Sequence, residues 1–398
     1  MRNIERIASH IKSLPRSGIR DFFELVIGMR DVISLGVGEP DFDTPWNIRE
    51  AAIYACEIGK TMYTSNRGLE SLRTAVSVYL KNRWNLAYHP ADEILITTGV
   101  SEAMDLAIRA VTEPGDEIII FEPSFVSYVP EVRMALGVPV CIPLNMKNGF
   151  KPDLKTLQTC ISSRTKAIII NSPNNPTGAA ASYKTLSAIS DLALKNNILI
   201  ITDDIYTELF YGKETCPSIA GIPALKNNLI YLNGFSKAYA MTGFRLGYVC
   251  APPDLTEAMM KIHQYTMMCA PIVSQEAGLE ALQNSAPDVL YMKEEYRKRR
   301  DYVFSFLTED IGLDCHLPEG AFYIFPSIAK TGMQAVEFCT GLLKKEKVAC
   351  VPGTAFGSSY KKHIRISYAS SMDELEEAMR RIKKYCSGKK RRTLYSGG

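Results

Sequence analysis

The chain has 398 residues, of which 46% are hydrophobic and 22% charged, a composition typical of a soluble globular protein with two or three domains. Its formal net charge at pH 7 is only +3, and the basic run at residues 389–392 alone supplies four positive charges, so the rest of the chain is close to neutral. This balance argues against a nucleic-acid-binding protein and against a membrane-surface protein.

The cysteines and the N-terminal segment indicate a cytoplasmic protein. Ten cysteines are scattered along the chain without a C-x-x-C pair, and only five histidines accompany them, so we expect reduced thiols and no metal site. The N-terminus lacks the apolar core of a signal peptide, and no run approaches the roughly 18 apolar residues of a membrane span.

The first predicted element is a short amphipathic helix. Ile4, Ile7, Ile11 and Leu14 recur at helical spacing before Pro15. Because the polar face of this helix is not strongly basic, we expect it to dock on the protein's own surface or on a partner subunit rather than on a membrane.

From about residue 50, apolar runs alternate with helical segments. Several of the runs are near-continuous Ile, Leu and Val, as in strands that are buried on both faces beneath helices. The seven predicted strands lie at 93–97, 117–121, 139–144, 166–170, 198–202, 229–232 and 246–250. This alternation predicts an α/β domain.

The C-terminal third has a different pattern. A long charged helix is predicted at about 286–307, and its interleaved acidic and basic residues indicate a solvated connecting helix. Short strands at 321–325 and 363–368 and a final helix from 372 to about 385 predict a second, smaller α+β unit. The basic run that follows is expected to be a solvated, frayed terminus.

The most informative segment runs from Gly234 to Gly247 and directly follows the predicted strand at 229–232. It places Lys237 on the turn after that strand and Arg245 eight residues later. A lysine amine in a mostly apolar pocket loses its proton readily and can attack a carbonyl to form a Schiff base. A fixed arginine nearby offers paired donors to a phosphate. Together the two residues predict a pocket for a phosphorylated aldehyde such as pyridoxal phosphate.

Every position of this segment matches the lysine signature of the class I and II aminotransferases, and the chain resembles that family in the same order over nearly its whole length. The resemblance implies the pyridoxal-phosphate fold-type I: a large domain with a mostly parallel seven-stranded sheet between helices, and a smaller α+β domain built from both chain ends. The expected divisions are an N-terminal arm with part of the small domain (1–48), a large cofactor-binding domain (49–290), a connecting helix with the small C-terminal domain (291–388) and a basic tail (389–398).

The resemblance assigns the phosphate of the cofactor to one turn and two further donors. Gly99, Val100 and Ser101 stand between the first predicted strand and an amphipathic helix, where backbone N–H groups and a hydroxyl can bind an anion. In register with the family, Ser236 and Arg245 complete this phosphate site.

Four further residues are assigned to the cofactor ring. The family stacks an aromatic residue on the pyridine ring at the position of Phe125, and the asparagine before Pro-Thr-Gly, here Asn175, hydrogen-bonds the phenolic oxygen. In the family pattern the aspartate three residues before a tyrosine holds the pyridine nitrogen, which selects Asp203, and Tyr206 joins Asn175 at the phenolic oxygen.

The aspartate assignment also has a physical basis. Asp203 and Asp204 end an Ile-rich strand, where burial of a carboxylate is costly unless a cation pairs with it. A protonated pyridine nitrogen is such a cation. Asp204 stands where relatives usually have glutamate, and we interpret it as structural.

Three residues are assigned to the substrate and the partner subunit. Arg365 alternates with apolar neighbours on a predicted strand, so it points inward, where its planar fork suits the α-carboxylate of an amino acid. Gly38 lets the backbone approach the same carboxylate. Tyr63 corresponds to a tyrosine that reaches the phosphate in the neighbouring subunit, so the resemblance implies a homodimer with shared active sites.

The resemblance implies an aminotransferase that moves an amino group between an L-amino acid and a 2-oxo acid, with Lys237, Asp203 and Tyr206 as catalytic residues and glutamate with 2-oxoglutarate as one pair. Ser101 and the segment 264–275 are uncharged where related aspartate enzymes carry a cation, which favours aromatic or a broad range of amino acids.

Three alternatives remain open. In an aspartate aminotransferase, Arg20 or a backbone donor would bind the distal carboxylate of the substrate. A lyase or decarboxylase can use pyridoxal phosphate on the same fold. A ligand-sensing regulator is disfavoured, because residues 1–50 have neither the length nor the basic charge of a DNA-binding module.

Overall fold

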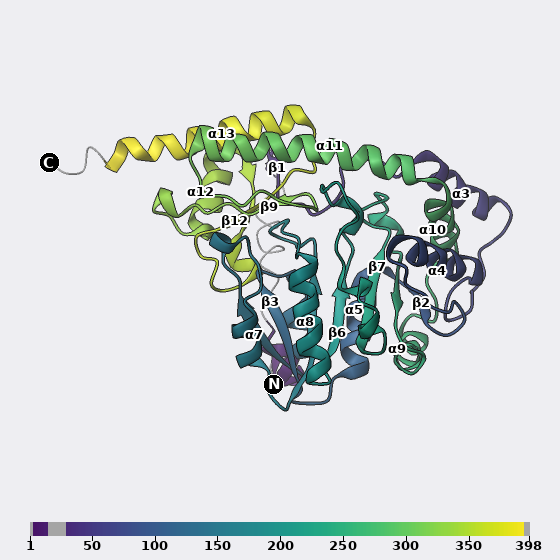
Figure 1. The fold of residues 1–398 in the computed structure, drawn as a ribbon. Coiled ribbons are helices and arrows are strands. Elements are labelled where there is room, and N and C mark those ends of the chain that lie inside the picture. The colour runs from purple at the N-terminus through teal and green to yellow at the C-terminus, as the bar shows by residue number, and fades with distance from the viewer. Residues whose placement is uncertain (1–2, 15–28, 394–398) are drawn as a thin grey trace.

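The seven predicted strands form one sheet. The computed structural model describes residues 3–14 and 29–393, and the sheet fills its larger part (Figure 1). The strands are β2 (Ile94–Thr97), β3 (Glu117–Glu122), β4 (Val138–Pro143), β5 (Thr165–Asn171), β6 (Leu199–Asp203), β7 (Leu229–Gly234) and β8 (Gly247–Cys250). In the order β2-β8-β7-β6-β5-β3-β4, only β8 runs antiparallel to its neighbours. The mostly parallel seven-stranded sheet is therefore confirmed.

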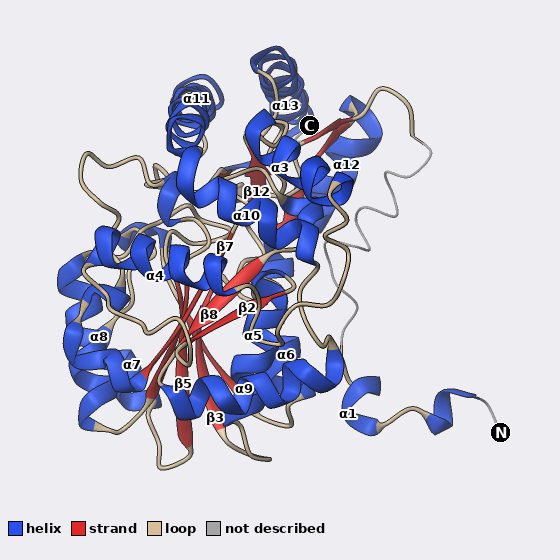
Figure 2. Cartoon of the chain, turned by 90° about the vertical axis from the view of Figure 1, so that its right-hand side faces the viewer, coloured by secondary structure: helices blue, strands red, loops and turns tan. Residues whose placement is uncertain are grey.

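Helices cover both faces of this sheet (Figure 2). One face packs against α5 (Gly99–Val111), α6 (Tyr128–Met134) and α9 (Pro253–Thr266), and the other against α4 (Glu70–Trp84), α7 (Leu154–Cys160) and α8 (Tyr183–Lys195). Successive residues of β3 alternate between the two cores: Ile118 and Ile120 belong to the first, Ile119 and Phe121 to the second. This double burial explains the near-continuous apolar runs in the sequence.

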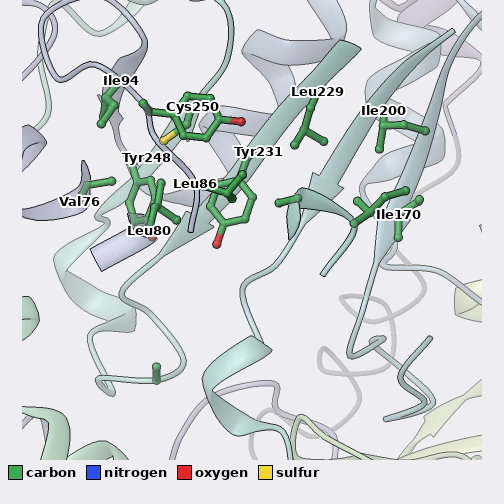
Figure 3. Packing of buried hydrophobic residues seen from close by; sticks show 14 of the residues in the cluster. Val76, Leu80, Leu86, Ile94, Ile170, Ile200, Leu229, Tyr231, Tyr248 and Cys250 are labelled. Carbon is green, nitrogen blue, oxygen red and sulfur yellow. The ribbon is translucent and has the colours of Figure 1, made fainter. Parts of the chain in front are cut away.

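The second of these cores also fixes the strands that carry the candidate site. Figure 3 shows part of it, with Val76 and Leu80 of α4 beside residues of the strands. Burial of one side chain of this size contributes about 1.5–3 kcal/mol. At the edge of this core, α3 (Trp46–Glu57) packs against α10 (Ile272–Asn284).

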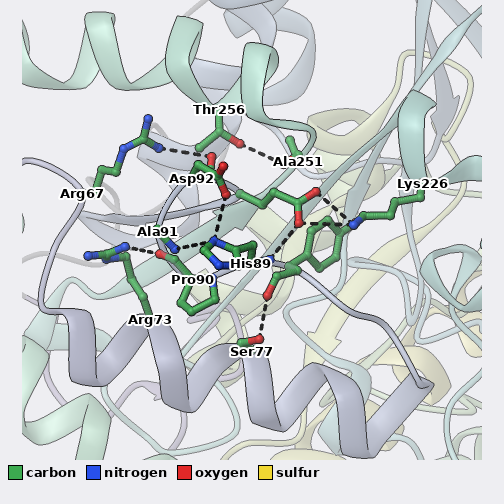
Figure 4. Close-up of polar contacts among 12 residues, drawn as sticks. Arg67, Arg73, Ser77, His89, Pro90, Ala91, Asp92, Lys226, Ala251 and Thr256 are labelled. Atoms are coloured by element: carbon green, nitrogen blue, oxygen red, sulfur yellow. Dashed lines mark hydrogen bonds and ion pairs between the residues drawn. The ribbon is translucent and has the colours of Figure 1, made fainter.

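Polar contacts tie the segment before β2 to its neighbours (Figure 4). The hydroxyl of Ser77 in α4 donates to the carbonyl of Tyr88 at 2.6 Å. Lys226 forms an ion pair with Glu93 at 3.0 Å. These contacts hold the start of β2, the strand that leads into the first loop of the candidate site.

A smaller unit is built from both chain ends, as predicted. β1 (Ile33–Ser34) pairs in parallel with β10 (Val348–Ala349), and a second small sheet has the order β11-β12-β9. Its other elements are β9 (Tyr323–Ile324), β11 (Val351–Pro352), β12 (Ile364–Ser367), α11 (Ala286–Ser305), α12 (Ala335–Glu346) and α13 (Met372–Thr393). Helices α11 and α13 lie along the top of Figure 1 and share one apolar core with these strands. The residue numbers at which we divided the chain into domains stay a prediction.

The connecting helix α11 has the predicted solvated face. Glu294 pairs with Arg297 and Glu295 with Lys298 on its surface, both at 2.6 Å. The helix continues into π-type turns at Phe306–Ile311. Short 3-10 turns lie at Met146–Asn148, Thr207–Leu209, Ile219–Gly221, Pro223–Asn228, Thr242–Phe244, Ala329–Thr331 and Gly353–Phe356.

The two ends of the chain differ from the sequence predictions. Instead of one N-terminal helix, the structure has a 3-10 turn at Asn3–Arg6 and a four-residue helix α1 (Ser9–Lys12), with Ile7 and Ile11 exposed. The prediction of a single helix is wrong: the segment forms two short helical turns, and helical segments this short have little stability of their own.

At the other end, α13 does not stop near residue 385 but continues to Thr393, so the basic run that we expected to be frayed is helical. Lysine and arginine are good helix formers, and positive charge is favourable near a helix C-terminus. Among the residues that the structure describes, no helix is long and apolar enough to cross a membrane.

Candidate active site

Most of the predicted site residues line one pocket of about 440 Å³. The pocket lies beyond the carboxyl ends of β5, β6 and β7, where open α/β sheets bind their ligands. The predicted residues in its wall are Gly38, Val100, Ser101, Phe125, Asn175, Asp203, Tyr206, Ser236, Lys237, Arg245 and Arg365. Residues far apart in the sequence therefore meet at the expected edge of the sheet.

Lys237 stands on the turn after β7 and is largely enclosed. Its Nζ donates to the carbonyl of Gly38 at 2.5 Å and lies 5.8 Å from the ring centre of Phe322. Burial and, next, the charge of Arg365 lower the pKa of the Lys237 amine to about 8. At neutral pH a useful fraction of this amine is therefore unprotonated, as a nucleophile or a base requires.

Asp203 ends β6 and faces the pocket. The hydroxyl of Tyr128 donates to its Oδ2 at 2.6 Å, and the backbone N–H of Ile205 donates to Oδ1 at 3.2 Å. Burial raises the pKa of Asp203, and these hydrogen bonds act in the opposite direction. A cation placed in the pocket would stabilise the charged form further.

The neighbouring Asp204 has a different setting and does not line the pocket. It accepts from the hydroxyls of Thr202 and Ser218, and burial raises its pKa to about 7. These contacts tie β6 to the loop that carries Ser218. The two adjacent carboxylates thus point to opposite sides of the strand, as alternation requires.

One end of the pocket is built to accept an anion. Gly99 has φ of +79°, and a Cβ there would lie 2.7 Å from Nη2 of Arg245. A Cβ on Gly247 would lie 2.7 Å from the backbone N of Val100. Only a glycine at this position lets β8 pack so closely against the turn. Among the described residues, the backbone N–H groups of Gly99, Val100 and Ser101 have no acceptor.

Arg365 occupies the opposite end of the pocket on β12 and is only 2% exposed. Its Nη2 donates to the carbonyl of Gly36 at 2.6 Å and its Nη1 to Oδ1 of Asn175 at 3.0 Å. The guanidinium lies between the rings of Tyr323 and Phe356, at 4.5 and 4.8 Å. Its Nε has no partner within the described chain, and burial lowers its pKa, so an anion at this end would be stabilising.

Two tyrosines of the site were not found from the sequence. Tyr128 belongs to the segment around Phe125 but gave no sign that it would contact Asp203, 75 residues away. Tyr323 bonds the hydroxyl of Tyr206 at 3.1 Å and stacks on Arg365. An aromatic residue in an apolar run is indistinguishable from core filler in sequence, so only the tertiary contact identifies either residue.

Other predicted residues lie elsewhere. Gly99 is beneath the pocket wall, packed on Arg245. Tyr63 is 78% exposed and lies outside the pocket, and Met267 and Met268, in the segment assigned to a partner's pocket, are also exposed. Arg20 lies outside the described residues.

The residues present fit pyridoxal phosphate. Free N–H groups, Ser101, Ser236 and Arg245 provide donors for a phosphate at one end. The unpaired face of the Asp203 carboxylate is suited to a ring cation, and Lys237 supplies an amine for an aldehyde. The buried guanidinium of Arg365 is left for a second anion, such as a substrate carboxylate.

Comparisons with known proteins cover nearly the whole chain. Residues 30–382 match the family described as aminotransferase class I and II. The chain is 48% identical over 379 residues to the protein YugH of Bacillus subtilis, covering 95% of this chain and 98% of that protein. It is 42% identical to the aspartate aminotransferase of Pyrococcus abyssi, covering 94% and 96%. A crystal structure of an aromatic aminotransferase from Pyrococcus horikoshii superimposes with a TM-score of 0.89 at 39% identity, covering 94% of this chain and 99% of that chain.

Proposed function

The chain belongs to the class I and II aminotransferases, and we propose that it binds pyridoxal phosphate through Lys237 to move an amino group between an L-amino acid and a 2-oxo acid. The observation that carries this proposal is the enclosed Lys237 amine, with its pKa lowered to about 8, in one pocket with Asp203 and Arg365. When bound, pyridoxal phosphate supplies an electron-withdrawing ring that stabilises the charge left on the substrate α-carbon.

The residues of this chain then have separate roles. Nζ of Lys237 anchors the cofactor and, once released by the substrate, takes the proton from the substrate α-carbon. Asp203, oriented by Tyr128, holds the proton of the pyridine nitrogen in place. Gly99, Val100, Ser101, Ser236 and Arg245 would hold the phosphate, and Phe125 would lie against the ring.

The remaining polar residues orient the reactants. Asn175 and Tyr206 donate to the phenolic oxygen of the cofactor. Arg365 binds the α-carboxylate of the substrate, with the backbone of Gly38 beside it. The contacts of Arg365 with Tyr323 and Asn175 hold its guanidinium ready for that anion.

We further propose that the substrate range favours aromatic or other apolar amino acids, with glutamate and 2-oxoglutarate as one pair. The chain is an aminotransferase of the aspartate and aromatic subgroup, and relatives of both kinds resemble it closely. Among the described residues that line the pocket, the cations are Lys237, Arg245 and Arg365, and each already has a role. Within the described part of the pocket wall, the short side-chain carboxylate of aspartate would therefore find no further cation, whereas Met104 and Val126 are apolar.

Single-turnover kinetics test this preference. We expect phenylalanine and tyrosine to convert the pyridoxal-phosphate form faster than aspartate, because burial of an unpaired carboxylate is costly. Stopped-flow absorbance with phenylalanine, tyrosine, alanine and aspartate measures the four rate constants. An aspartate rate constant about a hundredfold above the others would instead identify an aspartate aminotransferase.

We also propose that the active unit is a homodimer in which Tyr63 reaches the phosphate in the partner's site. Tyr63 is 78% exposed and is not among the residues that line the pocket of its own chain, and both observations support this proposal. A Lys237→Ala protein and a Tyr63→Phe/Arg245→Ala protein are each expected to be almost inactive. Mixing them after dissociation should raise activity, because one site of each heterodimer then combines an intact Lys237 with the intact Tyr63 of the other chain and carries only the Arg245→Ala substitution. Activity that stays at the unmixed level, although sedimentation shows heterodimers, would contradict shared sites.

A further inference from the structure

Behind the anion-binding end of the pocket lies a buried pair of titratable side chains with no role in the proposed chemistry. Nδ1 of His263 in α9 lies 2.6 Å from Oε1 of Glu102 in α5, and the two side chains are 0% and 7% exposed. Because a carboxylate oxygen only accepts, Nδ1 must carry the proton of this hydrogen bond. Burial of either group is costly unless it is hydrogen-bonded, and here each side chain provides a partner for the other.

The second oxygen of Glu102 acts on the turn before α5. The backbone N–H of Thr98 donates to Oε2 of Glu102. The next three N–H groups, of Gly99, Val100 and Ser101, have no acceptor among the described residues. Glu102 thus satisfies the one N–H that precedes the helix and leaves free those that line the anion-binding end.

His263 connects this turn to the end of α9. The N–H groups of Met267 and Met268 both donate to the carbonyl of His263, so its backbone closes the last turn of that helix while its ring contacts Glu102. Within the described chain, Nε2 of His263 has no partner. Among the described residues, the buried imidazole of His263 therefore has one hydrogen-bond partner, Glu102.

We propose that Glu102 and His263 are positioning residues for the phosphate of the cofactor. His263 fixes the carboxylate of Glu102, and Glu102 fixes the Thr98–Gly99 turn so that the free N–H groups converge on one anion. This inference rests on the proposed function, since it takes the anion to be the phosphate of pyridoxal phosphate. Neither residue lines the pocket, so they act through the backbone.

The test compares the affinity of the apoprotein for pyridoxal phosphate with its affinity for pyridoxal. Both aldehydes couple to Lys237, so the dissociation constant of pyridoxal divided by that of pyridoxal phosphate isolates the contribution of the phosphate. His263→Leu removes the donor and is expected to lower this ratio about tenfold, as loss of a buried hydrogen bond to a charged group would. His263→Asn, whose amide nitrogen can replace Nδ1, is expected to retain most of the ratio.

Thr256→Val is the matched control. Thr256 is also fully buried on α9, and its hydroxyl donates to the carbonyl of Ala251 at 3.0 Å, away from the phosphate turn (Figure 4). This variant is expected to lower the melting temperature of the apoprotein without changing the ratio. A fall in the ratio equal to that of His263→Leu would show that any damage to α9 has this effect, and would overturn the proposal.

The remaining outcomes are also decisive. An unchanged ratio in folded His263→Leu protein overturns the proposal. If that variant does not fold, Glu102→Leu replaces it, because leucine is of similar size but accepts neither hydrogen bond, and the ratio should fall severalfold. An unchanged ratio in Glu102→Leu then overturns the proposal. Wild-type protein that binds the two aldehydes equally would instead contradict the proposed function itself.

Discussion

Replacing Lys237 with alanine is expected to lower the rate of transamination by about 10³-fold or more, the combined loss of a covalent anchor and a general base. The pocket keeps its phosphate donors and Asp203, so pyridoxal phosphate should still bind. Borohydride reduction followed by mass analysis should find the cofactor attached to Lys237 in the wild type and to no residue in the variant. A reducible linkage that persists in Lys237→Ala protein would show that another amine is the anchor.

Two control variants test whether Lys237 acts through proton transfer rather than through its positive charge, and whether the effect is specific to this lysine. Lys237→Arg keeps a positive charge in the pocket, but arginine does not lose its proton near neutral pH, so this variant should be as inactive as Lys237→Ala. Lys226→Ala removes an amine that pairs with Glu93 outside the site, and it should retain wild-type turnover. Turnover near the wild-type level in Lys237→Arg protein would mean that the amine acts only as a charge.

The adjacent aspartates are expected to separate catalysis from stability. Asp203→Ala should lower the transamination rate by several orders of magnitude, because nothing then keeps the ring nitrogen protonated. Asp204→Ala should leave the rate of correctly folded protein largely unchanged. It should lower the free energy of unfolding by about 1–3 kcal/mol, since the buried hydroxyls of Thr202 and Ser218 lose their acceptor.

The measurements are steady-state rates and denaturant unfolding of both variants. Tyr128→Phe is the control for the hydrogen bond that Asp203→Ala also breaks, and its effect on the rate should be much smaller than that of Asp203→Ala. If the two aspartate substitutions exchanged their effects, the assignment of the ring-nitrogen partner would be one residue out of register.

The sequence predicted those parts of the molecule in which local pattern decides structure. Runs such as Ile118–Ile120 are apolar on both faces, so their strands and the helices around them could be placed before the fold was known. Lys237 and Asp203 were identified through the motifs shared with the family, and both lie near the carboxyl ends of such strands, which meet at one edge of a parallel sheet.

Contacts across long separations could not be predicted. Tyr323 meets Tyr206 across 117 residues, and His263 meets Glu102 across 161, with no local signal for either contact. The predictions for the two ends of the chain were wrong for a different reason. Periodicity suggested one helix around Ile7, where the structure has two short helical turns with Ile7 exposed, and charge suggested a frayed tail where α13 continues to Thr393. At both ends, whether the segment is helical depends on its length and its contacts, which the spacing of apolar and charged residues does not reveal.

The most direct test of the proposed function is a half-reaction with L-glutamate and the pyridoxal-phosphate form of the protein, without any 2-oxo acid. We predict one equivalent of 2-oxoglutarate and one of pyridoxamine phosphate per site, after which the reaction stops until a 2-oxo acid is added. A lyase or decarboxylase would instead keep turning over without an acceptor. Continuous product formation, or release of carbon dioxide in place of 2-oxoglutarate, would contradict transamination at Lys237.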